Sequence, residues 1–287
     1  MWKLKSYLLP ANDYSSISFE EALIFGDLVE SICKKDSLII PQEFYSYPDK
    51  NEISATEYLF KQEMDDVSQY LFDIVTKQLA SVNDYRELVE KISQFQGSFT
   101  RLVNKVDMDG IDNYLIETEN DIVKIKRTYI ALVDNYEDFK DRAIDCYPDL
   151  IFHTEAFTSI HKLGNISVVI DELMRHLSVL CDKGKDLYIK NENNEKATLD
   201  NLKSEFNITC SGKGSNEKLD YNKKIVIRKL IKENGVEKEA EIDFVLTCNP
   251  HTKFFDGYND QRIYFCWGRT EIRNHDIIII RVGDHWK

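Results

Sequence analysis

The stretch RIYFCWGRTEIRNHDIIIIRVGDHWK, residues 262–287, holds two strand-like runs joined by a polar loop. A strand over the first run places Arg262 and Tyr264 on the same face, because side chains alternate between the two faces of a strand. The second run, residues 277–282, is apolar on both faces until Arg281, which indicates a buried strand. Together the two runs predict neighbouring antiparallel strands.

Two further strand-like runs lie upstream, KKIVIRKLI at residues 223–231 and EIDFVLT at residues 241–247. The last three of the four runs are spaced as the strands of an antiparallel meander. We therefore expect a small antiparallel β domain over residues 225–287.

The first two-thirds of the chain is predicted to be helical. Two capping boxes mark helix starts, Ser18 with Glu21 and Ser54 with Glu57. The clearest helix is predicted over residues 112–147, where apolar residues recur at steps of three and four, as in a bundle helix or a dimeric coiled coil. Its apolar stripe consists of Ile122, Ile125, Tyr129, Leu132, Tyr136, Phe139 and Ala143.

A polar stretch at residues 185–224 separates the helical and strand-like parts. Its segments KNENNEKATLD and SGKGSNEK contain almost no large apolar residue, which is typical of a domain boundary. The predicted organisation is a helical domain over residues 1–190, a polar linker region over residues 191–224 and the β domain over residues 225–287. The fold class is therefore α+β, an N-terminal helical bundle followed by a small antiparallel β-sheet domain.

Charge and composition limit the possible functions. The 287 residues carry a net charge of −13, which argues against a dedicated nucleic-acid binder because phosphate backbones require a basic surface. No segment approaches the roughly 18 uninterrupted apolar residues of a membrane span, so no membrane partner is expected. The six cysteines are scattered without a CxxC pair, and no export signal precedes them. These features predict a cytoplasmic protein with reduced thiols.

Residues 251–287 are the exception to this acidity, since they hold six Lys/Arg against five acidic residues while the rest of the chain carries −14. Arg, Lys, His and Tyr side chains can bind and cleave phosphodiesters without a metal. A cluster of them at the ends of adjacent strands would hold a phosphate and supply a general base. The candidate catalytic residues are Arg262, Tyr264, His275, Arg281 and His285, and the candidate phosphate-binding residues are Lys253, Arg269 and Arg273.

A structural role is the alternative for the same residues. They would then cover the rim of the sheet and pair with acidic neighbours, namely Asp256, Asp260, Asp276 and Asp284. His176 lies beside the apolar stripe of a predicted helix, between Leu173 and Leu177. In such a position a hydrogen-bonded structural histidine is commoner than a catalytic one.

A metal site is a weaker possibility. Cys248 and His251 form a C-x2-H pair, and Cys266, His275 and His285 follow downstream. Zinc needs four convergent ligands, usually from two tight pairs, and only one pair is tight here. We therefore expect no metal and no other cofactor.

The arrangement of RIYFCW, a polar loop and a terminal IIIIRVGDHW resembles the closing strands of RelE/ParE-type bacterial toxins. It also resembles the ending of uncharacterised bacterial proteins encoded near phage-defence genes. The resemblance covers residues 240–287 and implies a toxin-like RNA-cleaving domain. This chain departs from the toxin pattern in two respects. The helical hairpin expected before the sheet is separated from it by the polar stretch, and the overall charge is acidic.

Two functions from different classes follow. The first is a non-catalytic interaction subunit of a multi-protein bacterial system, with anti-phage defence as the suggested setting. Its partner would be another protein subunit or a second copy of the chain, bound through Tyr129, Leu132, Tyr136 and Phe139 on the predicted long helix. The alternative is a toxin-like effector with metal-independent endoribonuclease activity in the C-terminal domain, and only this alternative makes RNA a partner. The acidic body and the long helix favour the interaction subunit.

Overall fold

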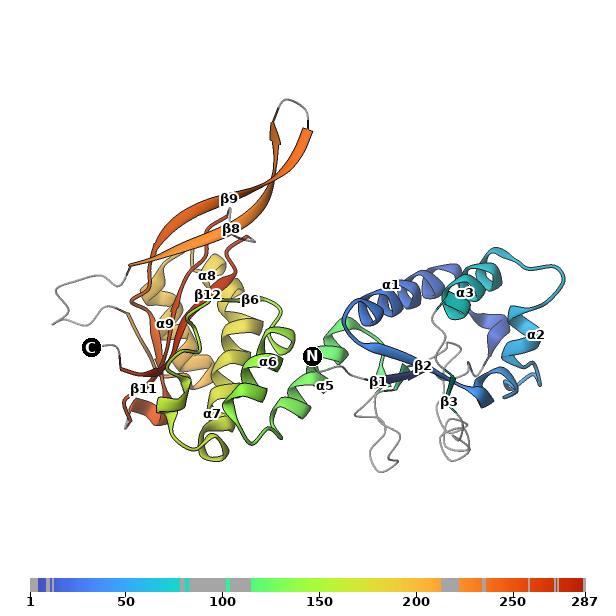
Figure 1. The fold of residues 1–287 in the computed structure, drawn as a ribbon, viewed down its shortest axis with the longest axis horizontal. Coiled ribbons are helices and arrows are strands. Elements are labelled where there is room, and N and C mark those ends of the chain that lie inside the picture. The colour runs from blue at the N-terminus through green and yellow to red at the C-terminus, as the bar shows by residue number, and fades with distance from the viewer. Residues whose placement is uncertain are drawn as a thin grey trace. The chain divides into compact units, whose positions relative to one another are not determined.

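The computed structural model describes residues 5–8, 11, 13–77, 81–82, 102–103, 115–212, 222–233, 236–257, 259–270, 272 and 274–285. The chain forms two compact units, Met1–Lys126 and Arg127–Lys287. The α+β class predicted from the sequence is confirmed (Figure 1). The division between the units falls at residues 126/127, whereas the sequence placed the end of the first domain at residue 190.

The first unit contains a sheet as well as helices, so the prediction of a purely helical bundle was incomplete. Its five strands are ordered β3-β2-β1-β4-β5, with β1 parallel to β2 and β2 parallel to β3. Strands β4 and β5 are antiparallel to their neighbours. The strands are β1 (Lys5–Leu8), β2 (Ser37–Pro41), β3 (Ser81–Val82), β4 (Leu102–Val103) and β5 (Leu115–Ile116).

The helices of this unit begin where the capping boxes predicted. Helix α1 (Phe19–Lys35) is capped by Ser18 with Glu21, and α2 (Ala55–Leu59) is capped by Ser54 with Glu57, both with the reciprocal hydrogen bonds in place. Helix α3 (Asp66–Lys77) packs on α1. Gly26 permits this close approach, since a Cβ there would lie 2.3 Å from the Tyr70 hydroxyl oxygen.

The predicted helix over residues 112–147 was wrong, because the structure divides it. Helix α5 (Glu119–Ile130) ends in a turn, and α6 (Tyr136–Cys146) begins after Asn135, whose side chain accepts a hydrogen bond from the Asp138 amide. Asparagine is a strong N-cap residue, so it starts a new helix. The spacing of apolar residues continues across the break because the end of α5, the turn and α6 each bury a side chain, namely Ile130, Val133 and Phe139.

The second unit is built on a five-stranded sheet of order β6-β12-β11-β10-β7. Its neighbours are antiparallel except β6 and β12, which run parallel. The strands are β6 (Leu150–Phe152), β7 (Cys210–Ser211), β10 (His251–Lys253), β11 (Gln261–Cys266) and β12 (Ile277–Asp284). The antiparallel sheet is thus confirmed for RIYFCW and IIIIRV, while the other two predicted strands lie elsewhere.

Those two strands, β8 (Asn222–Glu233) and β9 (Val236–Thr247), form a separate two-stranded antiparallel ribbon (Figure 1). The sequence predicted EIDFVLT, which lies in β9, as part of the same meander as β11 and β12. In the described residues β8 and β9 pair with each other along their full length, from Asn222 opposite Thr247 to Glu233 opposite Val236.

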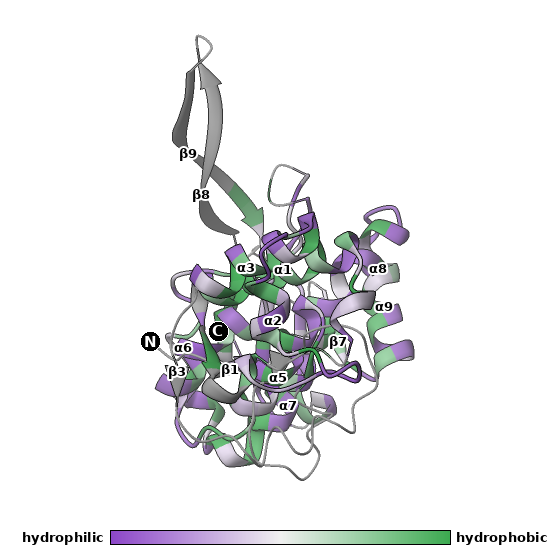
Figure 2. Ribbon diagram, turned by 90° about the vertical axis from the view of Figure 1, so that its right-hand side faces the viewer, coloured by the Kyte–Doolittle hydropathy of each residue, from purple (hydrophilic) through white to green (hydrophobic). Residues whose placement is uncertain are grey.

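Much of the predicted linker region 191–224 is regular structure. A π-helical turn (Leu180–Gly184) connects α7 (Ile166–Val179) to α8 (Lys185–Lys190), and α9 (Glu195–Phe206) follows. Figure 2 shows hydrophobic and hydrophilic residues side by side along α9, and its Leu199 and Leu202 are buried. A narrow apolar face therefore suffices to fix this helix, and residues 213–221 lie outside the described residues.

The two faces of the second sheet are covered differently. On one face, His176 of α7 is 2.7 Å from the Thr252 hydroxyl, Nδ1 to Oγ1, and its ring packs on Phe254. On the other face lies an apolar cluster of Leu246, Cys248, Cys266, Ile272, Ile278 and Ile280. No helix among the described residues is both long enough and apolar enough to cross a membrane.

Candidate functional site

The register of β10, β11 and β12 brings the predicted site residues into two rows. His251 pairs with Tyr264, which pairs with Arg281; two residues along, and so on the same face, Lys253 pairs with Arg262. Residues directly opposite in an antiparallel pair lie on the same face. The sheet therefore places the His251 imidazole, the Tyr264 phenol and the cationic groups of Lys253, Arg262 and Arg281 on the face opposite α7.

Three rings meet at this end of the sheet. The His251 and Tyr264 ring centroids are 4.9 Å apart, and the His285 ring is 6.4 Å from each of them. His285 follows β12 directly, so the end of that strand places it beside the other two rings. We call His251, Lys253, Arg262, Tyr264 and His285 the strand-end cluster.

The strand-end cluster carries surplus positive charge. Burial and, to a smaller degree, the positive charges of Lys253, Arg262 and His285 together lower the pKa of His251 to about 4. Burial and the neighbouring Arg262 likewise lower the pKa of Lys253. His251 is therefore neutral at pH 7, in a field that favours an anion.

Hydrogen bonds fix the two groups best placed for chemistry. His251 Nδ1 lies 3.0 Å from the Asn249 carbonyl oxygen, which can only accept, so Nδ1 carries the proton and Nε2 keeps its lone pair. The Arg262 guanidinium donates to the carbonyls of Asn259 and Gln261. In the described part of the chain the buried Nε of Arg262 has no acceptor. A buried donor without a partner is unfavourable until a ligand supplies an acceptor.

The other predicted catalytic residues are committed elsewhere. Arg281 forms an ion pair with Asp284, whose second oxygen is 3.1 Å from Lys162 Nζ. His275 lies in the loop after β11, with Nδ1 3.0 Å from the Gly268 carbonyl and Nε2 3.1 Å from the Thr270 hydroxyl. Arg281 and His275 therefore have the geometry of the structural role that the sequence offered as the alternative. The same holds for Asp276, which pairs with Lys185.

Arg269 does not add to the strand-end cluster. Arg269 is exposed in the loop beyond β11, with no place in the pairing of β10, β11 and β12. Arg273 lies outside the described residues. Of the two predicted phosphate-binding residues that the structure describes, Lys253 and Arg269, it brings Lys253 to the site.

The predicted partner-binding residues do not form one surface. Phe139 is fully buried against Phe157, with ring centroids 6.2 Å apart. The Tyr136 hydroxyl donates to the Gly164 carbonyl at 3.0 Å, and Tyr129 is half-buried. Leu132 alone of the four is well exposed, at 75%. The break between α5 and α6 explains this scatter, because the stripe no longer lies on a single helix.

His176 has the structural role predicted for it. Besides Thr252, it contacts Glu172, whose Oε1 is 3.2 Å from Nε2 and also accepts the Phe255 amide at 3.0 Å. The hydrogen bond from His176 is the main reason that the pKa of Glu172 falls to about 2. This buried chain of polar groups ties α7 to β10 and the turn after it.

The cysteines are packed in apolar surroundings. Cys248 and Cys266 lie together in the apolar cluster under the sheet, and the Cys248 thiol donates to the Leu246 carbonyl. Burial beside Cys248 raises the pKa of Cys266 far above its ordinary value. Among the described residues, no group of three or more His, Cys, Asp or Glu side chains could hold a metal ion.

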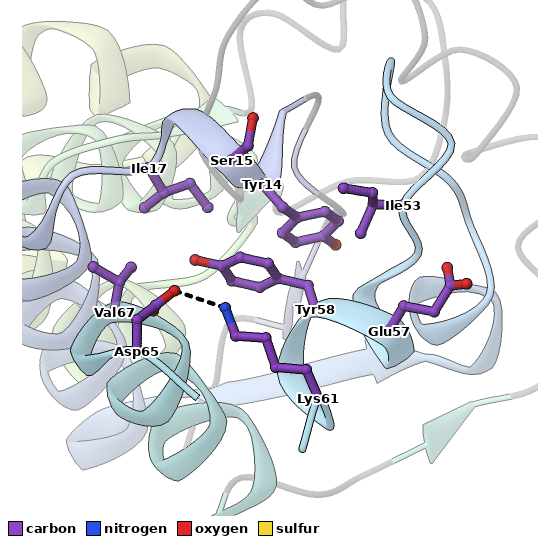
Figure 3. A pocket seen from close by; sticks show the side chains of 9 residues that line it. All are labelled: Tyr14, Ser15, Ile17, Ile53, Glu57, Tyr58, Lys61, Asp65 and Val67. Carbon is purple, nitrogen blue, oxygen red and sulfur yellow. Dashed lines mark hydrogen bonds and ion pairs between the residues drawn. The ribbon is translucent and has the colours of Figure 1, made fainter. Parts of the chain in front are cut away.

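A second candidate site lies in the first unit, and sequence reasoning missed it. It is a cavity of about 400 Å³ beside α2 and α3 (Figure 3). Tyr14 and Tyr58 stack at its centre, 5.0 Å between centroids and 24° between planes. Lys61 Nζ lies 4.7 Å from the centroid of the Tyr58 ring and 2.6 Å from Asp65 Oδ2. The lining is Tyr14, Ser15, Ile17, Ile53, Glu57, Tyr58, Lys61, Asp65 and Val67.

Comparison with known proteins identifies no relative. No protein-family model, no curated protein and no solved structure matches the chain.

Proposed function

We propose that the Arg127–Lys287 unit is a toxin-like effector that binds an RNA phosphate at the strand-end cluster and cleaves the chain without a metal. The observation that carries the proposal is the convergence of His251, Tyr264 and His285 with two cations across adjacent strands. Three of the five candidate catalytic residues belong to this cluster. His251, which the sequence suggested only as a metal ligand, is here assigned as the base in place of His275.

Charge supports phosphate as the ligand. Lys253 and Arg262 are opposite each other in the register, and neither is among the ion pairs of the described residues. An incoming phosphate would accept hydrogen bonds from both and give the Arg262 Nε an acceptor. Such preorganised positive charge is also what stabilises the extra negative charge of a phosphoryl transition state.

The two histidines suit the two proton transfers. In the proposed step, His251 Nε2 takes the proton of a ribose 2′-hydroxyl as its oxygen attacks the phosphorus. The bond from phosphorus to the 5′-oxygen breaks, and His285 gives that oxygen a proton. The products are a 2′,3′-cyclic phosphate and a 5′-hydroxyl end. Phosphate binding would itself raise the pKa of His251 toward neutrality, because it offsets the positive charges that lower it.

Burial determines the role of each member. Lys253 and His285 are half-buried and form the accessible side of the strand-end cluster, where we expect the phosphate to enter. Tyr264 is fully buried and packs on the His251 ring, so we assign it to hold that ring rather than to contact RNA. His251 and Arg262 are buried as well, so the phosphate would reach them from the side of Lys253 and His285. The acidic body then restricts RNA contact to this one place.

The resemblance to RelE/ParE-type toxins predicts helices directly before the sheet. In the structure α9 ends at Phe206 and β7 begins at Cys210, so a helix leads into this edge strand. The strands that carry the resemblance, β11 and β12, follow only after the ribbon of β8 and β9, and the acidic charge is the other departure from the toxin pattern.

The experiment is cleavage of a 5′-labelled RNA by the full chain in the presence of EDTA. We expect products with 2′,3′-cyclic phosphate ends, and a loss of about a hundredfold in rate for Arg262→Gln or His251→Asn. Arg269→Gln is the matched control, since this arginine is exposed and outside the cluster. Circular dichroism melting shows whether each variant is folded. If the wild-type chain neither cleaves RNA nor binds it, the proposal fails.

An interaction subunit remains the second candidate, and a different observation favours it. Helix α1 exposes three large apolar side chains: Phe19 at 47%, Leu23 at 40% and Ile24 at 55%. Neighbouring exposed apolar residues are characteristic of protein contact surfaces. If this face binds a protein, the double variant Leu23→Glu/Ile24→Glu abolishes association measured by light scattering or co-purification. Leu132→Glu is the control, because Leu132 is exposed but does not form one surface with the other predicted partner-binding residues.

A further inference from the structure

We propose that the cavity of the first unit binds a small aliphatic amine in its ammonium form. The inference is independent of the RNA-cleaving function. Its basis is that the cavity already holds such a group, because the Lys61 ammonium lies against the Tyr58 ring and the Asp65 carboxylate (Figure 3). Lys61 thus acts as a tethered ligand that a free amine can replace.

The charges on the cavity wall favour a cation. Among the described residues that line the cavity, Glu57 and Asp65 are acidic and Lys61 alone is basic. Lys61 is already paired with Asp65, so it does not offset the negative charge of Glu57. An anion that enters the cavity would therefore be repelled by the Glu57 carboxylate. An ammonium ion that takes the place of Lys61 inherits both of its contacts, and the released Lys61 side chain can turn to solvent.

The aromatic residues favour a cation as well. The face of a tyrosine ring carries negative electrostatic potential, which attracts an ammonium group. Tyr58 presents its face to Lys61, and Tyr14 stacks behind Tyr58. Burial raises the pKa of Tyr58 to about 12, and the negative charge of Asp65 contributes in the same direction. The Asp65 carboxylate thus adds negative potential at the Tyr58 ring, as a cation site requires.

The cavity is larger than an ammonium group, which indicates an organic amine. Its volume of about 400 Å³ falls within the usual range for small-molecule sites. Ile17, Ile53 and Val67 line it, and they offer apolar contacts to an alkyl chain. Access is open, because the side chains of Lys61 and Asp65 are 30% and 57% exposed. A neutral hydroxyl could donate a hydrogen bond to Asp65, but it would lack the charge attraction to that carboxylate and to the ring face.

The test is calorimetric or NMR titration of the full chain with 1,4-diaminobutane, with 1,4-butanediol as the neutral analogue. We expect weak binding to the wild-type protein, since Lys61 competes. Lys61→Met should bind about tenfold more tightly, because the tethered competitor is gone. Lys77→Met is the matched control: it removes one exposed lysine at the end of α3 that does not line the cavity.

Two further variants identify the contacts. Tyr58→Leu in the Lys61→Met background should lose at least tenfold in affinity, and Asp65→Asn should lose a similar factor. Backbone amide shifts of residues outside the cavity report whether each variant keeps its fold. The proposal is overturned if Lys61→Met binds the diamine no more tightly than Lys77→Met, or if butanediol binds equally well.

Discussion

The two candidate sites differ in whether their positive charges are paired with a carboxylate. In the cavity of the first unit, Lys61 is held by Asp65, so the basic group of the lining has its counter-charge in contact. In the strand-end cluster of the second unit, Lys253, Arg262 and His285 act together on His251, and each lowers its pKa. A matched pair is stable without a ligand, whereas a group of like charges is stabilised when an anion arrives. We therefore propose that the first site binds by exchange and the second by neutralisation.

The largest effect is expected where a matched pair is buried. Lys126 and Asp36 of the first unit are 2.7 Å apart, and each side chain is 4% exposed. Asp36→Ala leaves a buried lysine without its partner and should lower the free energy of unfolding by about 3–5 kcal/mol. Denaturant unfolding followed by circular dichroism measures the loss.

The control is the exposed pair of Glu30 and Lys34, whose side chains are both 68% exposed. Lys34→Met should change the free energy of unfolding by less than about 0.5 kcal/mol. Equal effects of Asp36→Ala and Lys34→Met would show that burial does not govern these pairs.

The strand-end cluster predicts a pH dependence of stability. His251 has a pKa of about 4 in the folded chain, below the ordinary value of 6.5. As the pH falls, the unfolded chain binds this proton at a higher pH than the folded chain does. The contribution of neutral His251 to the free energy of unfolding is therefore full above pH 6.5 and is lost as the pH falls toward 4. The loss should amount to about 3 kcal/mol at most.

His251→Asn is the variant that isolates this group, because it cannot titrate. It should reduce the decline in stability between pH 6.5 and 4, measured by urea unfolding at each pH. Part of the decline will persist, because burial lowers the pKa of His176 in the same direction. A pH profile unchanged in His251→Asn would show that the cluster does not depress this histidine.

Phosphate should stabilise the second unit and leave the first unchanged. A ligand present at ten times its Kd stabilises the state that binds it by about 1.4 kcal/mol. Hydrogen exchange with mass spectrometry distinguishes the units, and we expect slower exchange in β10, β11 and β12 when inorganic phosphate replaces chloride at equal ionic strength. Lys253→Met should reduce this protection, and the same variant should raise the pKa of His251. Protection that is equal in peptides of α1 and α3 would indicate a general salt effect.

Local signals in the sequence were sufficient for part of this structure. The capping boxes placed the starts of α1 and α2, and the alternation in RIYFCW placed Arg262 and Tyr264 on one face of a strand. These features depend on hydrogen bonds and spacings within a few residues. His176 was also predicted correctly, since its place in an apolar helix stripe implied burial and a hydrogen-bonded partner.

Features set by distant partners could not be predicted. The three-four spacing of apolar residues continues through the turn between α5 and α6, so it does not reveal that Asn135 starts a new helix there. His251 follows Pro250 in what reads as a loop, so its approach to Tyr264 is apparent only once β10 pairs with β11. The cavity is formed by residues 14–17 and 53–67, and no local pattern indicates that these segments meet.

The smallest effect is expected for the matched pair at the cavity rim. Lys61 and Asp65 are one helical turn apart in sequence, and their hydrogen bond is the main reason that the pKa of Asp65 falls to about 2. Because Asp65 is more than half exposed, solvent screens the pair, and a double-mutant cycle with Lys61→Met and Asp65→Asn should give a coupling below about 1 kcal/mol. Weak coupling is what exchange requires, since an incoming amine must displace Lys61. A coupling of several kcal/mol would mean that the pair is a fixed part of the fold and that the cavity cannot be opened by a small ligand.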